Sequence, residues 1–511
     1  MTKKIIIIAV VAVLLIAVLA VFALMPADRG EQGNDPTVTT PADQGNSGDS
    51  QDTPDQGDET TTALIESNVP DDLDFNQLEV TFLTWEEVSM NEFFVEDITG
   101  DTIGDQIYER NAQVEDALNV KLNFVSETCD ASTFSQFVQS ISTDISSGAC
   151  DYDIAAGYSR AAPLMALEGL ATELGEMKYM DVSNPWWAPA LTEECTINDK
   201  LYYCSGDIST NLLWMMTGTF FNKNLLDQHG LEDPYQLVKD NKWTLDKLIE
   251  MGAGTYSDLD GGGTSDDTDF FGHVIYNINV DGYLTSCGFI ALEKNNSGEI
   301  VTSPTMTSQK TYDMLDKLGE WLNSPDVIFK DSTKLRNVFF EERALFITDR
   351  VFIAAGKDNA SQNQEKIEFV YGIVPVVKYD ESQTEWYTSV GHPFTMYAIS
   401  AGVVNEQQLD ACDATLELLA QKGYELVTPA VFESAMKVKY AHDNDASAMY
   451  DILRENVRFD LGRLYSKQIG DVYKVMRNEV FNNTKTFASQ YKGLSRVIEK
   501  GIATISDFYE D

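Results

Sequence analysis

A hydrophobic period that switches repeatedly between that of a strand and that of a helix is the feature that most limits the fold of this chain. Residues 78–85, LEVTFLTW, place Leu78, Val80 and Phe82 at alternating positions, which predicts a strand. A helix is predicted over 103–118, a strand over 120–126, a helix over 134–145 and a short buried strand over 152–158. This order predicts an α/β fold with a mostly parallel sheet covered by helices on both faces.

The same alternation continues to the end of the chain. Further strands are predicted at 200–204, 344–348 and 368–376, and helices at 406–421, at 445–457 and over most of the remaining residues. With 511 residues, 43% of them hydrophobic, the chain is long enough for several lobes around a large core. No repeat of about 20 to 50 residues is visible, which argues against a solenoid.

The first 27 residues predict export from the cytoplasm. Lys3 and Lys4 precede the apolar run 5–25, which is long enough to cross about 30 Å of hydrocarbon. Two interpretations stay open: an uncleaved membrane anchor, or a signal peptide cleaved near Ala23 or Ala27. Both put the rest of the chain outside the cell. Because no cysteine precedes Cys129, attachment through a lipid-modified cysteine after this segment is excluded.

Residues 28–74 predict a disordered acidic linker. The segment is rich in Gly, Pro, Gln, Thr, Ser and acidic residues, and no aromatic residue occurs between Met25 and Phe75. It is either a tail without a role or a tether that holds the folded part away from the membrane.

The charge of the chain limits its partners. Its 36 Lys and Arg against 82 Asp and Glu give a net charge of -46, which repels nucleic acid and anionic membranes. Nucleic acid is therefore excluded as a partner, and the charge predicts ligands that are neutral or cationic. A strongly acidic surface also keeps an exported protein soluble.

One pair of cysteines has the spacing of a cross-strand disulfide. In CTINDKLYYC, a two-residue turn at Asp199 and Lys200 would place Cys195 opposite Cys204 at a position where side chains of paired strands approach closely. This predicts a Cys195–Cys204 disulfide. Cys412 lies on a helical apolar stripe and is predicted to be a buried free thiol, and the remaining cysteines have no predicted pairing.

Aromatic and polar residues follow several of the predicted strands. In open α/β sheets, ligands bind outside the carboxyl ends of the strands. Flat aromatic faces beside carboxylates, amides and arginine suit a sugar ring and its hydroxyl groups. The strand-end residues that predict such a site are Trp85, Glu86, Tyr158, Ser159, Arg160, Asp207, Asn211 and Trp214. For each Trp alone, a place in the core is the competing interpretation.

The order of segments resembles the bacterial extracellular solute-binding proteins of family 1, in their sugar-binding branch. The similar stretches include VTFLTW, YDIAAGY, INDKLYYCSGDIS, FFEERALFITD, EFVYGIVPVVKYDE and HPFTMYAIS, within residues of about 75 to 470. The resemblance implies two α/β lobes joined by hinge strands, with a solute held between them. It implies a first lobe of 75–217 plus 345–399 and a second lobe of 218–344 plus 400–511.

The resemblance also implies a function and further contacts. It implies a monomer that captures a sugar or oligosaccharide and delivers it to the permease subunits of an ABC transporter. Tyr283, Trp386 and His392 are then further cleft residues, and closure would place a sugar ring among Trp85, Trp214 and Tyr283. Asp207, Arg160 and Glu86 would bind its hydroxyl groups.

The stretch DLDGGGTSDDTD, residues 258–269, has the spacing of a calcium loop. Calcium binds six to eight oxygens, and a loop of this kind needs a glycine at its sixth position, here Gly263. The candidate ligands are Asp258, Asp260, Thr264, Asp266, Asp267 and Asp269. A structural calcium ion in the second lobe and an acidic turn without a metal both stay open.

Three other functions would each explain some features of this sequence. A glycoside-acting enzyme would need two carboxylates, but no pair stands out among 82 acidic residues, and no motif of another enzyme class is present. The sequence therefore predicts that the chain is not an enzyme. A cell-surface adhesin would not need the order of lobes and hinges. A binding protein coupled to a membrane sensor stays open, because sensing and transport use the same closed lobes.

Overall fold

The computed structural model describes residues 65–355, 367–441 and 443–510. The predicted membrane segment and most of the predicted acidic linker lie outside the described residues. Residues from Ile65 onward form one compact unit. Within the described part of the chain, no helix combines the length and the apolar character that a membrane crossing requires.

The first sheet carries the predicted β-α-β-α-β unit. Its strand order is β12-β3-β1-β2, with β1 (Leu78–Trp85), β2 (Val120–Glu127) and β3 (Ile154–Tyr158) parallel and β12 (Thr395–Ile399) antiparallel to β3. The connecting helices are α2 (Thr102–Leu118) and α3 (Phe134–Ser147). These five elements confirm the sequence prediction to within two residues at each boundary.

Local signals explain where α2 begins and ends. Asp101 is its N-cap, and the carboxylate accepts a hydrogen bond of 2.8 Å from the Gly104 amide, satisfying a backbone donor that has no partner within the helix. Asn119 ends the helix in the left-handed region at φ 50°, a conformation that Asn adopts more readily than most residues. The chain then enters β2 directly.

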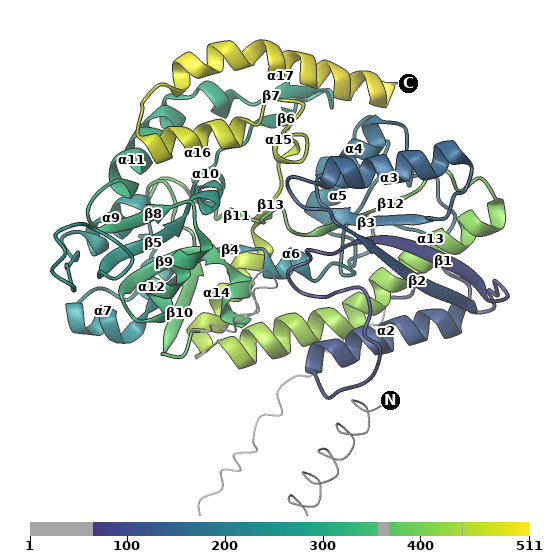
Figure 1. The fold of residues 1–511 in the computed structure, drawn as a ribbon, viewed down its shortest axis with the longest axis horizontal. Coiled ribbons are helices and arrows are strands. Elements are labelled where there is room, and N and C mark those ends of the chain that lie inside the picture. The colour runs from purple at the N-terminus through teal and green to yellow at the C-terminus, as the bar shows by residue number, and fades with distance from the viewer. Residues whose placement is uncertain (1–64, 356–366, 442, 511) are drawn as a thin grey trace, which may run out of the picture. The chain divides into compact units, whose positions relative to one another are not determined.

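The second sheet is built from later segments. Its order is β10-β4-β9-β5-β8: β10 (Tyr371–Pro375) and β9 (Ala344–Arg350) lie antiparallel on either side of β4 (Thr217–Asn222), while β5 (Phe271–Tyr276) runs parallel to β9 and to β8 (Val327–Lys330). We call the first sheet with its helices the first lobe, and the second sheet with its helices the second lobe. Figure 1 shows the two sheets in separate halves of the unit.

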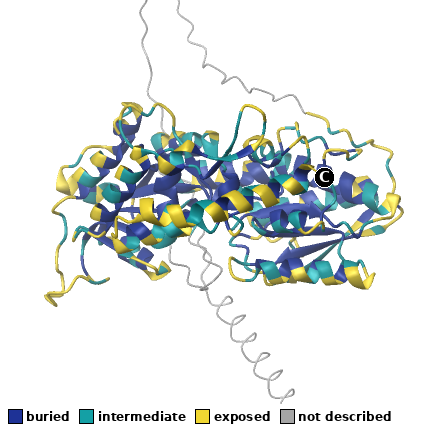
Figure 2. Cartoon of the chain, turned by 90° about the horizontal axis from the view of Figure 1, so that it is seen from above, coloured by how far each residue is buried: buried dark blue, intermediate teal, exposed yellow. Residues whose placement is uncertain are grey.

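Helices cover both lobes. Those of the first lobe include α4 (Ala161–Leu167) and α13 (Glu406–Lys422), which packs against α2 and β1. Around the second lobe lie α7 (Lys223–His229), α8 (Pro234–Lys239), α9 (Leu245–Gly252), α10 (Val280–Ser286), α11 (Gln309–Leu322), α12 (Arg336–Phe340), α14 (Asn444–Glu455), α15 (Leu461–Leu464), α16 (Val472–Asn482) and α17 (Phe487–Glu510). Figure 2 shows the strands buried and the outer faces of the helices exposed, so each sheet lies in a core.

The remaining elements are short and connect the lobes or extend them. They are α5 (Pro189–Cys195), α6 (Asn211–Trp214), the paired strands β6 (Leu292–Lys294) and β7 (Ile300–Thr302), the paired strands β11 (Thr388–Ser389) and β13 (Val457–Arg458), the 3-10 helices η1 (Asn277–Asn279), η2 (Pro304–Thr307), η3 (Thr333–Leu335) and η4 (Val351–Ala355), and the π-helices η5 (Gly423–Val427) and η6 (Ala430–Tyr440).

The chain divides between the lobes differently from the prediction. The first lobe was expected to resume at residue 345, but β9 and β10 belong to the second sheet, where β9 is paired on both edges. Conversely, α13 belongs to the first lobe because its buried face packs on β1 and α2. The chain therefore passes between lobes before β4, between β10 and β12, and again between α13 and α14.

The predicted strand at 200–204 is wrong. Only isolated bridges occur there, from Ile197 to Lys200 and from Cys204 to Tyr397. Cys195 lies at the end of α5 and not on a strand, so the predicted hairpin does not reach it. Both cysteines are buried free thiols, and the predicted Cys195–Cys204 disulfide is not present in the structure. Cys412 is a buried free thiol, as predicted.

Candidate functional site

The carboxyl end of β3 meets the loop that leads into β12. The Ser159 hydroxyl donates a hydrogen bond of 2.8 Å to the carbonyl oxygen of His392 and lies 3.2 Å from its Nδ1. The ring of Tyr158, the last residue of β3, has its centroid 6.1 Å from that of His392. Three residues predicted for the site are thus in contact, although 233 positions separate Ser159 from His392.

The last residue of β9 reaches the same loop from the second lobe. A Cβ atom added at Gly391 would lie 2.8 Å from Cδ of Arg350, so this glycine permits the arginine side chain to lie directly against the loop. The guanidinium of Arg350 lies 5.0 Å from the ring centroid of Phe352 and 3.7 Å, at Nε, from Asp349. The loop before β12 therefore contacts a residue from each sheet.

Two arginines from the C-terminal helices complete this region. Nη1 of Arg463 donates hydrogen bonds to the Ser389 hydroxyl, at 2.8 Å, and to the Val390 carbonyl, at 2.9 Å. Asp281, at the start of α10, accepts bonds of 2.7 and 2.8 Å from Nη1 of Arg477 and lies 3.6 Å from Arg463. The region thus joins both lobes.

Arg160 approaches from the first lobe. Its Nη2 pairs with Asp471, just before α16, at 3.2 Å, and its guanidinium lies 4.9 Å from the ring centroid of Phe134. We call the set around the loop before β12 the inter-lobe cluster. Its members are Tyr158, Ser159, Arg160, Arg350, His392, Arg463 and Arg477.

The electrostatics of the cluster follow from burial among cations. Burial raises the pKa of Tyr158 to about 12, although Arg160, Arg463 and Arg350 act in the opposite direction. Burial, together with the nearby Arg463, Arg160 and Arg477, holds the pKa of His392 well below its usual range. At neutral pH the cluster therefore offers a neutral imidazole and a neutral phenol among charged guanidinium groups.

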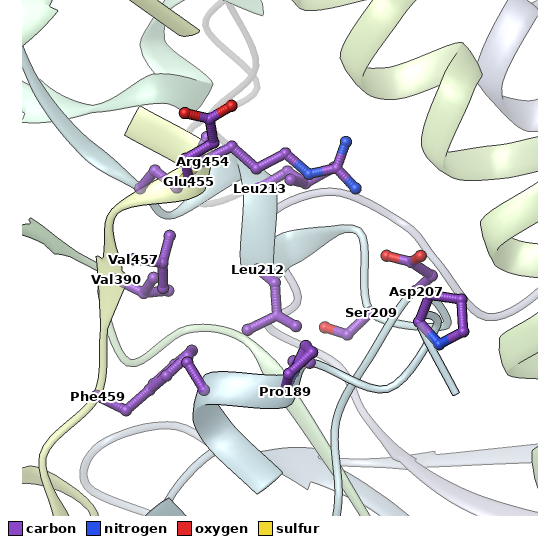
Figure 3. A pocket seen from close by; sticks show the side chains of 14 residues that line it. Pro189, Asp207, Ser209, Leu212, Leu213, Val390, Arg454, Glu455, Val457 and Phe459 are labelled. Atoms are coloured by element: carbon purple, nitrogen blue, oxygen red, sulfur yellow. The ribbon is translucent and has the colours of Figure 1, made fainter. Parts of the chain in front are cut away.

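A second feature is an apolar cavity of about 330 Å³ between α5, α6 and β13. Figure 3 shows Leu212 at its centre and Asp207 at one side. Burial raises the pKa of Asp207 to about 7, against the opposing effects of Arg454 and of the Thr428 hydroxyl. The cavity is lined by Pro185, Ala188, Pro189, Ala190, Asp207, Ser209, Leu212, Leu213, Met216, Val390, Arg454, Glu455, Val457 and Phe459.

The aromatic residues predicted to stack on a sugar lie in the core. Trp85, Trp214 and Tyr283 are all at most 2% exposed. Trp85 donates from Nε1 to the Thr395 hydroxyl at 2.9 Å, and the Tyr283 hydroxyl lies 2.8 Å from that of Thr348. Because packing encloses their rings, these side chains cannot stack on a sugar in this structure, and their predicted contacts with a ligand are wrong.

The other predicted contacts occupy different surroundings. Asn211 is fully buried, and its Nδ2 donates hydrogen bonds to Glu92, at 2.9 Å, and to the Met90 carbonyl, at 2.7 Å. Its role is therefore structural. Trp386 is half-buried, with Nζ of Lys378 4.2 Å from its ring centroid. Glu86 is exposed. For Glu86 and Trp386, contact with a ligand stays a prediction.

Four residues of this region were missing from the sequence prediction: Arg350, Arg463, Arg477 and Asp281. Arg350 had a signal that could have found it, because it lies two residues after the predicted strand ALFIT, at a strand end of the kind from which other site residues were predicted. Arg463, Arg477 and Asp281 lie on helices of the second lobe, and only the packing of those helices brings them to the loop before β12.

The acidic loop contains a close group of carboxylates. Oxygens of Asp258, Asp260 and Asp269 lie within 4.8 Å of one another. The side chains also cap the loop's own backbone: Asp258 accepts from the Gly261 and Gly263 amides at 2.7 and 2.9 Å, and buried Asp269 accepts from Leu259 at 3.0 Å. The other predicted ligands are placed differently, because Thr264 and Asp267 are exposed and Asp266 accepts from Thr268.

Two α/β lobes, each built on its own sheet and joined by three chain crossings, with polar side chains of both lobes gathered where they meet, define a protein of the two-lobed solute-binding class. The sequence model of the bacterial extracellular solute-binding proteins matches residues 111–407. The chain therefore belongs to this family, whose members are extracellular binding proteins.

Solved structures share the fold. A cyclo/maltodextrin-binding protein complexed with maltotetraose is 11% identical, and the match covers 84% of this chain and 96% of that one with a TM-score of 0.51. A cyclic alpha-maltosyl-1,6-maltose binding protein from Arthrobacter globiformis is 13% identical, with 85% and 99% covered and a TM-score of 0.51. No curated protein matches the chain. These likenesses confirm the predicted two-lobed fold.

Proposed function

We propose that this protein captures a carbohydrate between its two lobes and delivers it to an ABC importer, without changing the carbohydrate chemically. The family and the saccharides named for the two similar structures support this proposal. The observation that carries it is the inter-lobe cluster, where hydrogen-bonding side chains of both lobes converge on residues 389–392.

The chemistry of the cluster suits a polyhydroxylated solute. Guanidinium groups donate hydrogen bonds in a fixed fork, which matches neighbouring oxygens of a sugar. Neutral His392, which is half-buried, adds a ring with both polar and apolar surface, of the kind that contacts sugar rings, and the buried ring of Tyr158 packs against it. A solute that contacts both lobes at once would stabilise a closed arrangement of the protein.

The melting temperature of the full chain, scanned against monosaccharides, oligosaccharides and short peptides, tests this function. A ligand that binds only the native state raises the melting temperature. We expect a rise with one class of saccharide, with the saccharide recovered unchanged. No rise with any saccharide, or a rise with peptides alone, would reject a carbohydrate ligand.

We propose in addition that residues 1–27 hold the protein at the outer face of the membrane and that residues 28–74 act as its tether. The apolar run that follows two lysines supports this. Cell fractionation tests it: the intact chain should stay with membranes after a high-salt wash, and a chain that is released and begins near residue 24 or 28 would show cleavage instead.

The acidic loop is proposed to bind a structural calcium ion. The three carboxylates within 4.8 Å of one another support this, since calcium prefers several carboxylate oxygens. Calcium should raise the melting temperature of the full chain, EDTA should reverse the rise, and Asp258→Asn should abolish it. Asp227→Asn, at an exposed position outside the loop, is the matched control. An equal response of both variants would reject the site.

A further inference from the structure

Arginines dominate the charge of the inter-lobe cluster in an otherwise acidic protein. The chain has 36 Lys and Arg against 82 Asp and Glu. In the cluster, four arginines share three aspartates: Arg160 pairs with Asp471, Arg463 and Arg477 share Asp281, and Arg350 approaches Asp349. The local balance of charge is therefore the reverse of that of the whole molecule.

Two of these arginines are incompletely neutralised. Asp349 makes its shortest ion pair with Arg336, at 2.6 Å, and lies 3.7 Å from Arg350. Asp281 bonds Arg477 at 2.7 Å and lies 3.6 Å from Arg463. Within the described part of the chain, Arg350 and Arg463 thus have only the longer contact with a carboxylate that another arginine already holds.

The same two arginines have unused hydrogen-bond donors. Among the described residues, Nε of Arg350 and Nε of Arg463 are buried and have no hydrogen-bond partner. The two side chains are only 13% and 10% exposed, so water neutralises them poorly. A buried donor without a partner, on a group whose charge is not neutralised, destabilises the folded protein unless a ligand supplies the missing acceptor.

Both arginines also lie against the same stretch of chain. Arg463 bonds Ser389 and Val390, and Arg350 lies against Gly391. His392, which follows directly, contacts Ser159 of the first lobe. An anion bound here would therefore be next to the residues through which we propose that the saccharide joins the lobes.

We propose that the saccharide bound at this site is anionic and carries a carboxylate or sulfate group that Arg350 and Arg463 bind. The inference rests on the proposed function and names the class of its ligand. A planar guanidinium matches the paired oxygens of both groups, and hydrogen bonds to an ionised acceptor are stronger than those to a hydroxyl. An anionic ligand differs from the neutral or cationic ligand that the net charge predicts, and it is compatible with that charge because contacts within about 4 Å outweigh charges screened beyond about 8 Å.

Isothermal titration of the full chain with three probes tests the proposal: maltotetraose, a galacturonate oligomer of the same length, and a heparin-derived oligosaccharide. We expect the galacturonate or the sulfated probe to bind about 10- to 100-fold more tightly than maltotetraose, the range for hydrogen bonds to charged groups. Tight binding of the galacturonate assigns a carboxylate, and tight binding of the heparin fragment alone assigns a sulfate.

Variants locate the effect. Arg350→Gln should weaken binding of the anionic probe by about as much as the expected difference in affinity between the anionic and neutral probes. Arg350→Lys keeps the positive charge but loses the forked pair of donors, so it should weaken this binding less. Both variants should weaken the binding of a neutral sugar by a smaller factor than the binding of the anionic probe, because a hydroxyl accepts a weaker hydrogen bond than an ionised group. Arg496→Gln removes one positive charge at an exposed position of α17 and serves as the matched control. Melting curves without ligand show whether each variant folds.

The outcomes separate this inference from the function on which it rests. Equal affinity for neutral and anionic probes, or an equal loss of both in Arg350→Gln, would overturn the anionic ligand and leave carbohydrate binding standing. No binding of any saccharide by the unaltered chain would overturn both. If Arg350→Gln fails to fold, Arg350→Lys and the comparison of probes on the unaltered chain still decide.

Discussion

Asp207 shows how one buried group sets a pH dependence. Its carboxyl is at one side of the apolar cavity, and burial raises its pKa from 3.8 to about 7 (Figure 3). Between these values the native state keeps a proton that the unfolded state releases. The free energy of unfolding contributed by this group is therefore fully present below pH 3.8 and is lost as the pH rises through 7.

Asp207→Asn should consequently stabilise the protein at pH 8, by on the order of 2 kcal/mol, and change little at pH 4, because the amide is never charged. Urea unfolding at both pH values measures this. Asp227→Asn, at an exposed position of α7, should change neither value. A loss of stability in Asp207→Asn at pH 8 would show that the charged carboxylate is favoured in the native state.

Among single residues, the sequence predicted four of the seven members of the inter-lobe cluster and missed Arg350, Arg463 and Arg477. His392 was predicted from the resemblance to solute-binding proteins, and Tyr158, Ser159 and Arg160 were predicted because they lie at the end of a strand of the first sheet. Trp85 was placed at the site for the same reason, yet packing encloses its indole ring, which bonds Thr395. Strand ends can be read from periodicity, whereas the direction of each side chain depends on the elements that cover both faces of the sheet.

At the scale of elements, α13 is fixed to the first lobe by carboxylates on its buried face. Glu417 accepts hydrogen bonds from the indole nitrogens of Trp186 and Trp187, at 3.2 and 2.9 Å, and from Nδ2 of Asn184 at 2.9 Å. Asp413 accepts from the backbone amides of residues 178–180. The NPWW stretch at 184–187 therefore has a structural role, because its side chains are bound to α13.

Glu417→Ala should lower the free energy of unfolding by about 3 kcal/mol, since it leaves two buried indole donors without acceptors. Chemical denaturation measures this loss. Glu406→Ala, at an exposed position in the first turn of the same helix, should cost less than about 0.5 kcal/mol. Similar losses in both variants would mean that Glu417 contributes only helix propensity.

The helices and strands were predicted well where the hydrophobic pattern is regular along the whole element. The first five elements and the helices over 406–421 and 445–457 appear close to their predicted bounds. The assignment of elements to lobes failed at β9, β10 and α13, because strand pairing between distant segments leaves no local signal. The segment 200–204 has the composition of a strand but makes only two isolated bridges, from Lys200 to Ile197 and from Cys204 to Tyr397.

At the scale of the whole molecule, the charge of -46 and the inter-lobe cluster have opposite signs. The acidic surface repels anions at long range, and salt screens this repulsion over about 8 Å. The cluster acts at contact distance and determines what is held between the lobes. Selectivity for the solute is thus separated from the surface charge that keeps an exported protein soluble.

We propose that a saccharide is held between two lobes that close on it. Small-angle X-ray scattering of the full chain, with and without a saturating saccharide identified by the melting scan, measures this closure. Closure of the lobes brings mass towards the centre, so we expect a smaller radius of gyration with the ligand. A saccharide that binds at saturation and leaves the scattering curve unchanged would contradict it.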